Sequence, residues 1–229
     1  MKIYSYTLNM VLLNIMSIIL FILCFIIVIP IYGEGLVINS VPLLLSLSII
    51  YLIAHEFIHY LGFIINKNID RKKVVLGAEL EKGILYCMCK TKISKKNILI
   101  SVFAPLVTIG IITLIIGIYF HLDMLIFLSI MNIASSIGDI IMGFFILRLP
   151  KDISYVDFDD TTSFYIISKE DISNYKFPGI ILKDQKNYKE EMCAKDYTKI
   201  KVSKTSMITF IILLIIIIGG LIWKIKDLH

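Results

Sequence analysis

Charge is scarce over long stretches of this sequence. Asp, Glu, Lys and Arg make up 18% of the 229 residues, whereas hydrophobic residues make up 58%. A soluble domain of this size has too high a surface-to-volume ratio to bury so much apolar surface. Uncharged apolar runs of about 18 or more residues are long enough to cross roughly 30 Å of hydrocarbon. The sequence therefore predicts a polytopic membrane protein.

Cysteine is also sparse, and its four copies (Cys24, Cys87, Cys89 and Cys193) lack the spacing of a disulfide scaffold. The pair Cys87 and Cys89 could hold a metal. With one residue between them and no second pair, we favour two ordinary thiols on one face of a strand. The first apolar run is too long for a secretory signal and no small-x-small cleavage site follows it, so we expect a retained anchor.

Five apolar segments are candidates for membrane spans. They are residues 8–31, 36–65, 98–120, 124–149 and 206–223. Between them, residues 74–92 hold two β-prone runs around a Glu-Lys-Gly turn, which predicts a hairpin. Residues 155–168 contain another possible strand. The predicted fold is therefore an all-α polytopic membrane protein of about five transmembrane helices with a small β-hairpin insertion.

We expect four regions along the chain. They are an N-terminal transmembrane anchor at 1–35, a catalytic transmembrane core at 36–150 with three helices and the hairpin 74–92, a cytoplasmic loop at 151–204, and a C-terminal transmembrane helix at 205–229. The net charge of +5 does not indicate nucleic-acid binding, because the basic residues flank the apolar segments. They gather at 66–97 and 148–204, and the positive-inside rule places both segments in the cytoplasm. The N-terminus is then inside, the C-terminus is outside, and the host bilayer is expected to be the cell membrane.

The few ionisable residues inside the apolar segments carry the functional signal. The second segment contains His55, Glu56 and His59, the fourth contains Asp139, and the other three have none in their interiors. An ionisable group in lipid costs several kcal/mol, so it persists only when it is paired, hydrated or bound to a metal. All four are residue types found in zinc sites.

The spacing of the histidines fits a metal site on a helix. His55 and His59 lie about 40° apart on one helical face, so both imidazoles can reach one ion. Glu56 lies beside that face, where it can take a proton from water at the metal. This is the H-E-x-x-H arrangement of zinc peptidases. The alternative is a coincidental cluster of structural polar residues.

A catalytic zinc requires a third protein ligand, and Asp139 is the one remaining acidic or imidazole side chain at depth. In the topology above, His55, His59 and Asp139 all lie roughly 10–15 Å beneath the cytoplasmic boundary. The alternative for Asp139 is a structural hydrogen bond. Asn132 lies two helical turns before Asp139 and is a candidate for binding substrate, although a helix–helix contact is at least as plausible. Pro105 should kink its helix.

The sequence resembles a known family at these motifs. The residues AHEFIHYLGF on an apolar helix, a hairpin, Phe103-Ala104-Pro105 and then NIASSIGDI are similar to zincin peptidases related to site-2 intramembrane proteases. The resemblance covers residues 36–150 and implies a three-helix core like that of site-2 proteases. It also implies zinc ligation by His55, His59 and Asp139, with Glu56 as the catalytic base.

The expected activity is zinc-dependent hydrolysis of peptide bonds in a membrane protein or peptide within the bilayer, with Zn²⁺ as cofactor. Two alternatives remain open at this point. One is a non-catalytic metal-binding or metal-transport protein that uses the same His and Asp residues. The other is a membrane-bound peptidase whose third ligand is a glutamate, which the lack of Glu in any later apolar segment disfavours.

Overall fold

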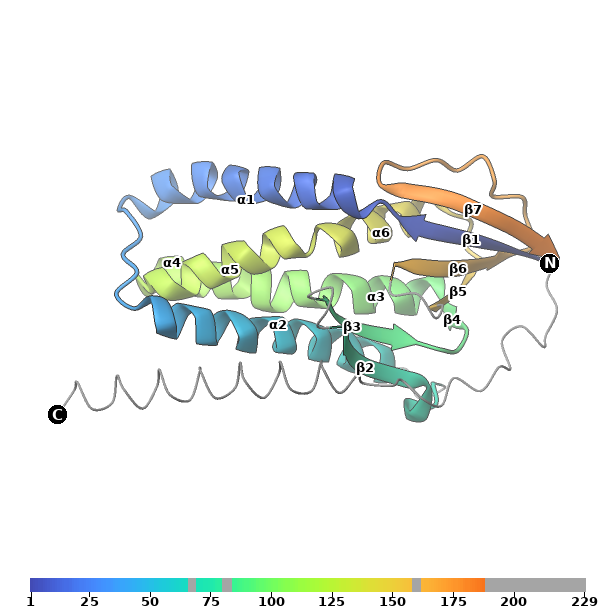
Figure 1. Ribbon diagram of the computed structural model, residues 1–229, viewed down its shortest axis with the longest axis horizontal. Coiled ribbons are helices and arrows are strands. Elements are labelled where there is room, and N and C mark those ends of the chain that lie inside the picture. Colours follow the sequence, from blue (N-terminus) through green and yellow to red (C-terminus); the bar gives the residue numbers. More distant parts are fainter. Residues whose placement is uncertain (66–68, 80–83, 158–161, 188–229) are drawn as a thin grey trace.

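The computed structural model describes residues 1–65, 69–79, 84–157 and 162–187, and shows a helical bundle with a sheet at one end (Figure 1). The helices are α1 (Met10–Tyr32), α2 (Val41–Ile64), α3 (Lys95–Pro105), the π-helical η2 (Leu106–Ile112), α4 (Thr113–Tyr119), α5 (Asp123–Ser135) and α6 (Ile137–Arg148). The strands are β1 (Lys2–Leu8), β2 (Val74–Glu79), β3 (Ile84–Cys89), β4 (Ile93–Ser94), β5 (Ser154–Asp157), β6 (Ser163–Ser168) and β7 (Ile180–Asn187). A short 3₁₀ turn, η1 (Arg71–Lys73), precedes β2.

Three helical segments within the described part of the chain are long and apolar enough to cross a membrane. They are α1, α2 and the continuous run Lys95–Tyr119. The predicted fourth span is instead two helices, α5 and α6, which meet at a 47° bend and could together make a fourth crossing. The predicted span at 206–223 lies outside the described residues.

Side-chain hydrogen bonds account for where several helices begin and bend. Asn9 and Ser40 cap α1 and α2 by accepting the backbone N–H three residues on. At the bend between α5 and α6, the hydroxyls of Ser135 and Ser136 both donate to the carbonyl oxygen of Asn132, at 3.0 and 2.8 Å. Back-bonding of this kind bends helices, and here it starts α6 with Asp139 in its first turn.

The sheet makes the predicted all-α class wrong, because the fold is mixed. Five antiparallel strands pair in the order β4-β5-β6-β1-β7. Strand β1, which pairs with β6 and β7, was expected to be part of the N-terminal anchor. Strands β5, β6 and β7 lie in the segment expected to be a loop with one possible strand. The pairing of β1 with β6 joins residues more than 150 positions apart in the sequence, so no local sequence pattern predicts it.

The separate hairpin was predicted, and the structure confirms its two strands. β2 pairs with β3 from Val74 opposite Cys89 to Glu79 opposite Ile84. The predicted turn residues lie outside the described part of the chain. Figure 1 shows this hairpin beside the end of α2.

Aromatic side chains fix the five-stranded sheet against the helices. Tyr6 on β1 packs edge-on against Phe145 of α6, with ring centroids 4.9 Å apart, and stacks with Phe164 of β6 at 5.7 Å. Tyr155 of β5 stacks on the same Phe164 at 5.5 Å. Aromatic pairs at these distances are favourable beyond the area they bury. The sheet therefore closes one end of the bundle, next to α6.

Candidate metal centre

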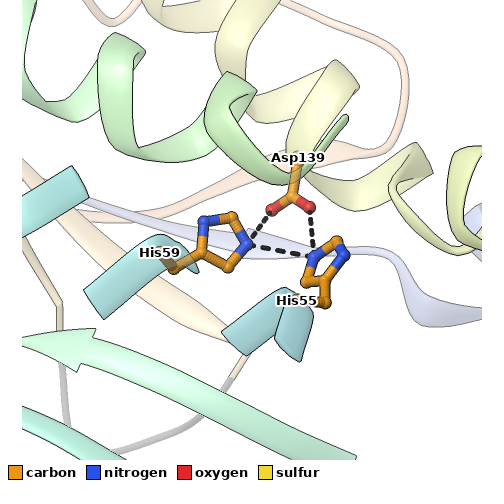
Figure 2. A group of neighbouring side chains, drawn as sticks. All are labelled: His55, His59 and Asp139. Carbon is orange, nitrogen blue, oxygen red and sulfur yellow. Dashed lines mark hydrogen bonds and ion pairs between the residues drawn. The ribbon is translucent and has the colours of Figure 1, made fainter. Parts of the chain in front are cut away.

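Two imidazoles and one carboxylate meet where α2 faces the start of α6. His55 Nε2 lies 3.1 Å from Asp139 Oδ2, His59 Nε2 lies 3.4 Å from Asp139 Oδ1, and the two Nε2 atoms lie 3.1 Å apart (Figure 2). The histidines are buried, at 6% and 8% exposure, and the Asp139 side chain is 18% exposed. The structure thus brings the three predicted ligands together from helices 84 residues apart.

The other nitrogen of each imidazole is held by an oxygen acceptor. His55 Nδ1 lies 2.9 Å from Asn132 Oδ1, and His59 Nδ1 lies 2.8 Å from the carbonyl oxygen of Ser101. These oxygens accept, so each Nδ1 carries the hydrogen and each neutral ring presents its Nε2 lone pair. Metal-bound histidines are oriented in this way in many proteins, by a partner on the second ring nitrogen.

The arrangement fits a bound cation. Both Nε2 atoms and the Asp139 carboxylate lie close enough together to bind one ion, and a cation between them would stabilise these three acceptors. A tetrahedral zinc with Zn–N bonds of about 2.0–2.1 Å sets two ligand atoms about 3.3 Å apart, close to the separations found here. Two imidazoles and a carboxylate are a zinc donor set that leaves the fourth position for water or substrate.

Glu56 lines a cavity beside these three side chains but is not one of the three possible ligands. Its carboxylate lies near the backbone N–H of Cys87 on β3. The cavity has a volume of about 170 Å³ and is lined by Glu56, His59 and Asp139 together with residues of β3, β5 and β6. A carboxylate held here can exchange a proton with a water molecule beside the three ligands.

A second carboxylate, Asp157, binds the same edge of β3. Its Oδ2 accepts from the backbone N–H of Cys89 at 2.7 Å, and its Oδ1 accepts from the Tyr155 hydroxyl. Burial raises the pKa of Asp157 to about 6, and it also lines the cavity. This edge of β3 thus binds Asp157 through the Cys89 N–H and lies beside Glu56.

Sequence reasoning missed the supporting groups. Asn132 was expected to bind substrate or to make a helix–helix contact, and the structure points its side-chain oxygen at His55; a role with substrate stays a prediction. The Ser101 carbonyl and the Cys87 N–H are backbone groups, which no side-chain motif reveals. One available signal was Gly62, one turn after His59, because small residues mark close helix approaches.

Comparison with protein families identifies a relationship over this part of the chain. A family model described as "Putative zincin peptidase" matches residues 48–154, just under half of the chain. The matched range contains the buried group His55, His59 and Asp139. Comparisons with curated proteins and with solved structures return no match. A zincin family implies zinc as the metal, in agreement with the donor set.

Proposed function

We propose that the protein is an intramembrane zinc metalloprotease, related to site-2 proteases, that hydrolyses peptide bonds of membrane-associated substrates. One observation carries the proposal. His59, Asp139 and Glu56 line one cavity at the end of long apolar helices, and His55 completes the group of three possible metal ligands. The zincin match over residues 48–154 supports the same activity.

The chain's own residues account for the chemistry as follows. His55, His59 and Asp139 would hold zinc, which when bound lowers the pKa of water and polarises a peptide carbonyl. Glu56 removes a proton from the attacking water as the oxygen–carbon bond forms. Glu56 then delivers that proton to the leaving nitrogen as the carbon–nitrogen bond breaks. The backbone N–H of Cys87 lies beside the Glu56 carboxylate.

The proposed orientation places the sheet, and the end of the helices next to the metal centre, in the cytoplasm. Residues of β1, β4, β5, β6 and β7 share one sheet, so they must lie on one side of the bilayer. This agrees with two crossings between β1 and β4 and two between β4 and β5. The basic segments favour the cytoplasmic side. Reporter fusions after Lys90 and at the N-terminus should both report the cytoplasm, and opposite sides would contradict this topology.

The decisive experiment compares the wild type with Glu56→Gln. Single-pass membrane proteins tagged at both ends are co-expressed with each form, and zinc is measured in the same purified proteins. Loss of a general base lowers rates by about 10²–10⁴-fold, while zinc content should stay unchanged because Glu56 is not a ligand. Glu34→Gln, in the exposed connection between α1 and α2, is the matched control and should cleave normally.

Two outcomes would count against the proposal. Undiminished cleavage by a zinc-loaded Glu56→Gln protein would exclude Glu56 as the base. If the wild type cleaves nothing but moves zinc across vesicle membranes, the metal-transport function replaces this one. The glutamate-ligand peptidase is disfavoured by the contact of Asp139 with both histidines.

A further inference from the structure

The support of His59 depends on a carbonyl that an ordinary helix would not leave available. In an α-helix, the carbonyl of residue i accepts the backbone N–H of residue i+4. Four residues after Ser101 stands Pro105, which has no N–H. The Ser101 carbonyl oxygen instead accepts the Nδ1–H of His59 at 2.8 Å.

Close packing of α2 on α3 brings that carbonyl within reach. Gly62 lies one turn after His59, and a Cβ at Gly62 would come 2.6 Å from the Ser101 Cα. The Ser101 hydroxyl also donates to the backbone carbonyl of His59 at 2.9 Å. Ser101 therefore holds both the ring and the backbone of the same ligand.

The support of His55 also contacts Pro105. Asn132 presents its side-chain oxygen to His55, and its Nδ2 donates to the Pro105 carbonyl at 3.4 Å. The π-helical turn of η2 begins immediately after Pro105, and within it a Cβ at Gly110 would lie 3.3 Å from Asn132 Nδ2. Both histidine supports thus converge on this buried proline.

We infer that Pro105 is a positioning residue of the metal centre, which acts by withholding the backbone N–H that would otherwise occupy the Ser101 carbonyl. The inference rests on the proposed binding of zinc by His55, His59 and Asp139. With an N–H at position 105, the Ser101 carbonyl would also accept from its own helix, which would align the carbonyl with the helix axis and away from His59 Nδ1. The His59 ring would then lose the contact that directs its Nε2 toward His55 and Asp139.

A role for Pro105 in shaping the helix makes a different prediction. A proline ring also clashes with the preceding turn and bends a helix. If that bend were what matters, any residue without the ring would disturb the centre equally. If the missing N–H matters, a residue that lacks both ring and N–H should preserve the centre.

The test uses two replacements of Pro105 in the full-length protein in detergent. Pro105→Ala restores the N–H, whereas lactic acid at position 105, introduced as an α-hydroxy acid, removes the ring but supplies an ester oxygen in place of the N–H. Zinc affinity is measured by competition with a chelator, and the absorption of bound Co²⁺ reports the ligand geometry. Loss of an outer partner of a metal ligand typically weakens metal binding 10–100-fold. We expect that loss, with an altered Co²⁺ spectrum, for Pro105→Ala alone.

The control is Pro30→Ala, because Pro30 lies inside α1, away from the centre, and should leave zinc affinity unchanged. Wild-type affinity in Pro105→Ala would overturn the inference. Weak binding by the lactic acid protein would also overturn it, even if Pro105→Ala failed to fold. A wild type that binds no zinc would instead contradict the proposed function.

Discussion

The helices α1 and α2 are alike in length and apolarity but differ in what their polar side chains contact. They have 23 and 24 residues, and in each the most apolar stretch is only 11% buried within the protein. In α1, Ser17 donates to the backbone carbonyl of Ala134 and makes a simple helix–helix contact. In α2, His55 and His59 are each held by a group from a different helix, and Glu56 lies beside β3.

The difference shows that function in this fold arises where several elements converge on one helix turn. α5 supplies Asn132, α3 supplies the Ser101 carbonyl, β3 supplies the Cys87 N–H and α6 supplies Asp139. α1 lies among the same helices (Figure 1) but contributes none of these groups. Changes in α2 should therefore alter metal binding, and changes in α1 should alter only packing.

The largest effect, a loss of zinc affinity, is expected from His59→Ala. Loss of an outer partner weakens metal sites by about 10–100-fold, so loss of a ligand should weaken zinc binding by at least about 100-fold. Isothermal titration of the detergent-solubilised protein with zinc measures this loss of affinity. Full affinity in this variant would mean that His59 is not a ligand and that α2 resembles α1 after all.

The pH dependence of stability should be altered next most strongly by Asp157→Asn. Burial raises the pKa of Asp157 from 3.8 to about 6, so the folded state holds this proton more tightly than the unfolded state. The resulting stabilisation is complete below about pH 4 and is lost as the pH rises through about 6, at most about 3 kcal/mol. Thermal unfolding between pH 4 and 7 should show this decline in the wild type and a flatter profile in the variant. Parallel profiles would contradict a raised pKa.

The difference between α1 and α2 can largely be predicted from the sequence, because the sequence features that distinguish the two helices are local. The apolar runs identify α1 and α2, and the scarcity of ionisable residues within them isolates His55, Glu56, His59 and Asp139. Two short β-prone runs around a glycine-containing turn predict the hairpin.

Close packing of α2 on α3 gives a third prediction. Gly62→Ala places a Cβ 2.6 Å from the Ser101 Cα, and overpacking of this kind costs about 1–3 kcal/mol. Gly138→Ala is the matched control, because among the described residues its Cβ would meet only Leu13, at 3.9 Å. Denaturation in mixed micelles compares the two. Equal stability would show that α2 and α3 can separate without penalty.

The smallest effect is expected in α1. Ser17→Ala removes the hydrogen bond to Ala134, which should lower stability by about 0.5–1.5 kcal/mol and leave zinc affinity unchanged. The same unfolding and zinc titrations test both statements. A loss of zinc affinity would mean that α1 also supports the metal centre, and the contrast between the helices would fail.

What the sequence could not reveal depends on distant pairing and on backbone atoms. β1 is a short strand directly before a long apolar run, and its partners β6 and β7 lie near the other end of the described chain. The groups next to His59 and Glu56 are a backbone carbonyl and a backbone N–H, which have no side-chain signature in the sequence. Only the packing of α3 and β3 decides which of them face α2.

Zinc content of the purified wild type beside Asp139→Ala tests the central claim most directly. Asp123→Ala is a matched control, because Asp123 lies in the first turn of α5, as Asp139 does in α6, but bonds Tyr32 and Val37. We expect one zinc per chain in the wild type and in Asp123→Ala, and little or none in Asp139→Ala, because a three-ligand site tolerates little loss. Full zinc occupancy in Asp139→Ala would contradict it.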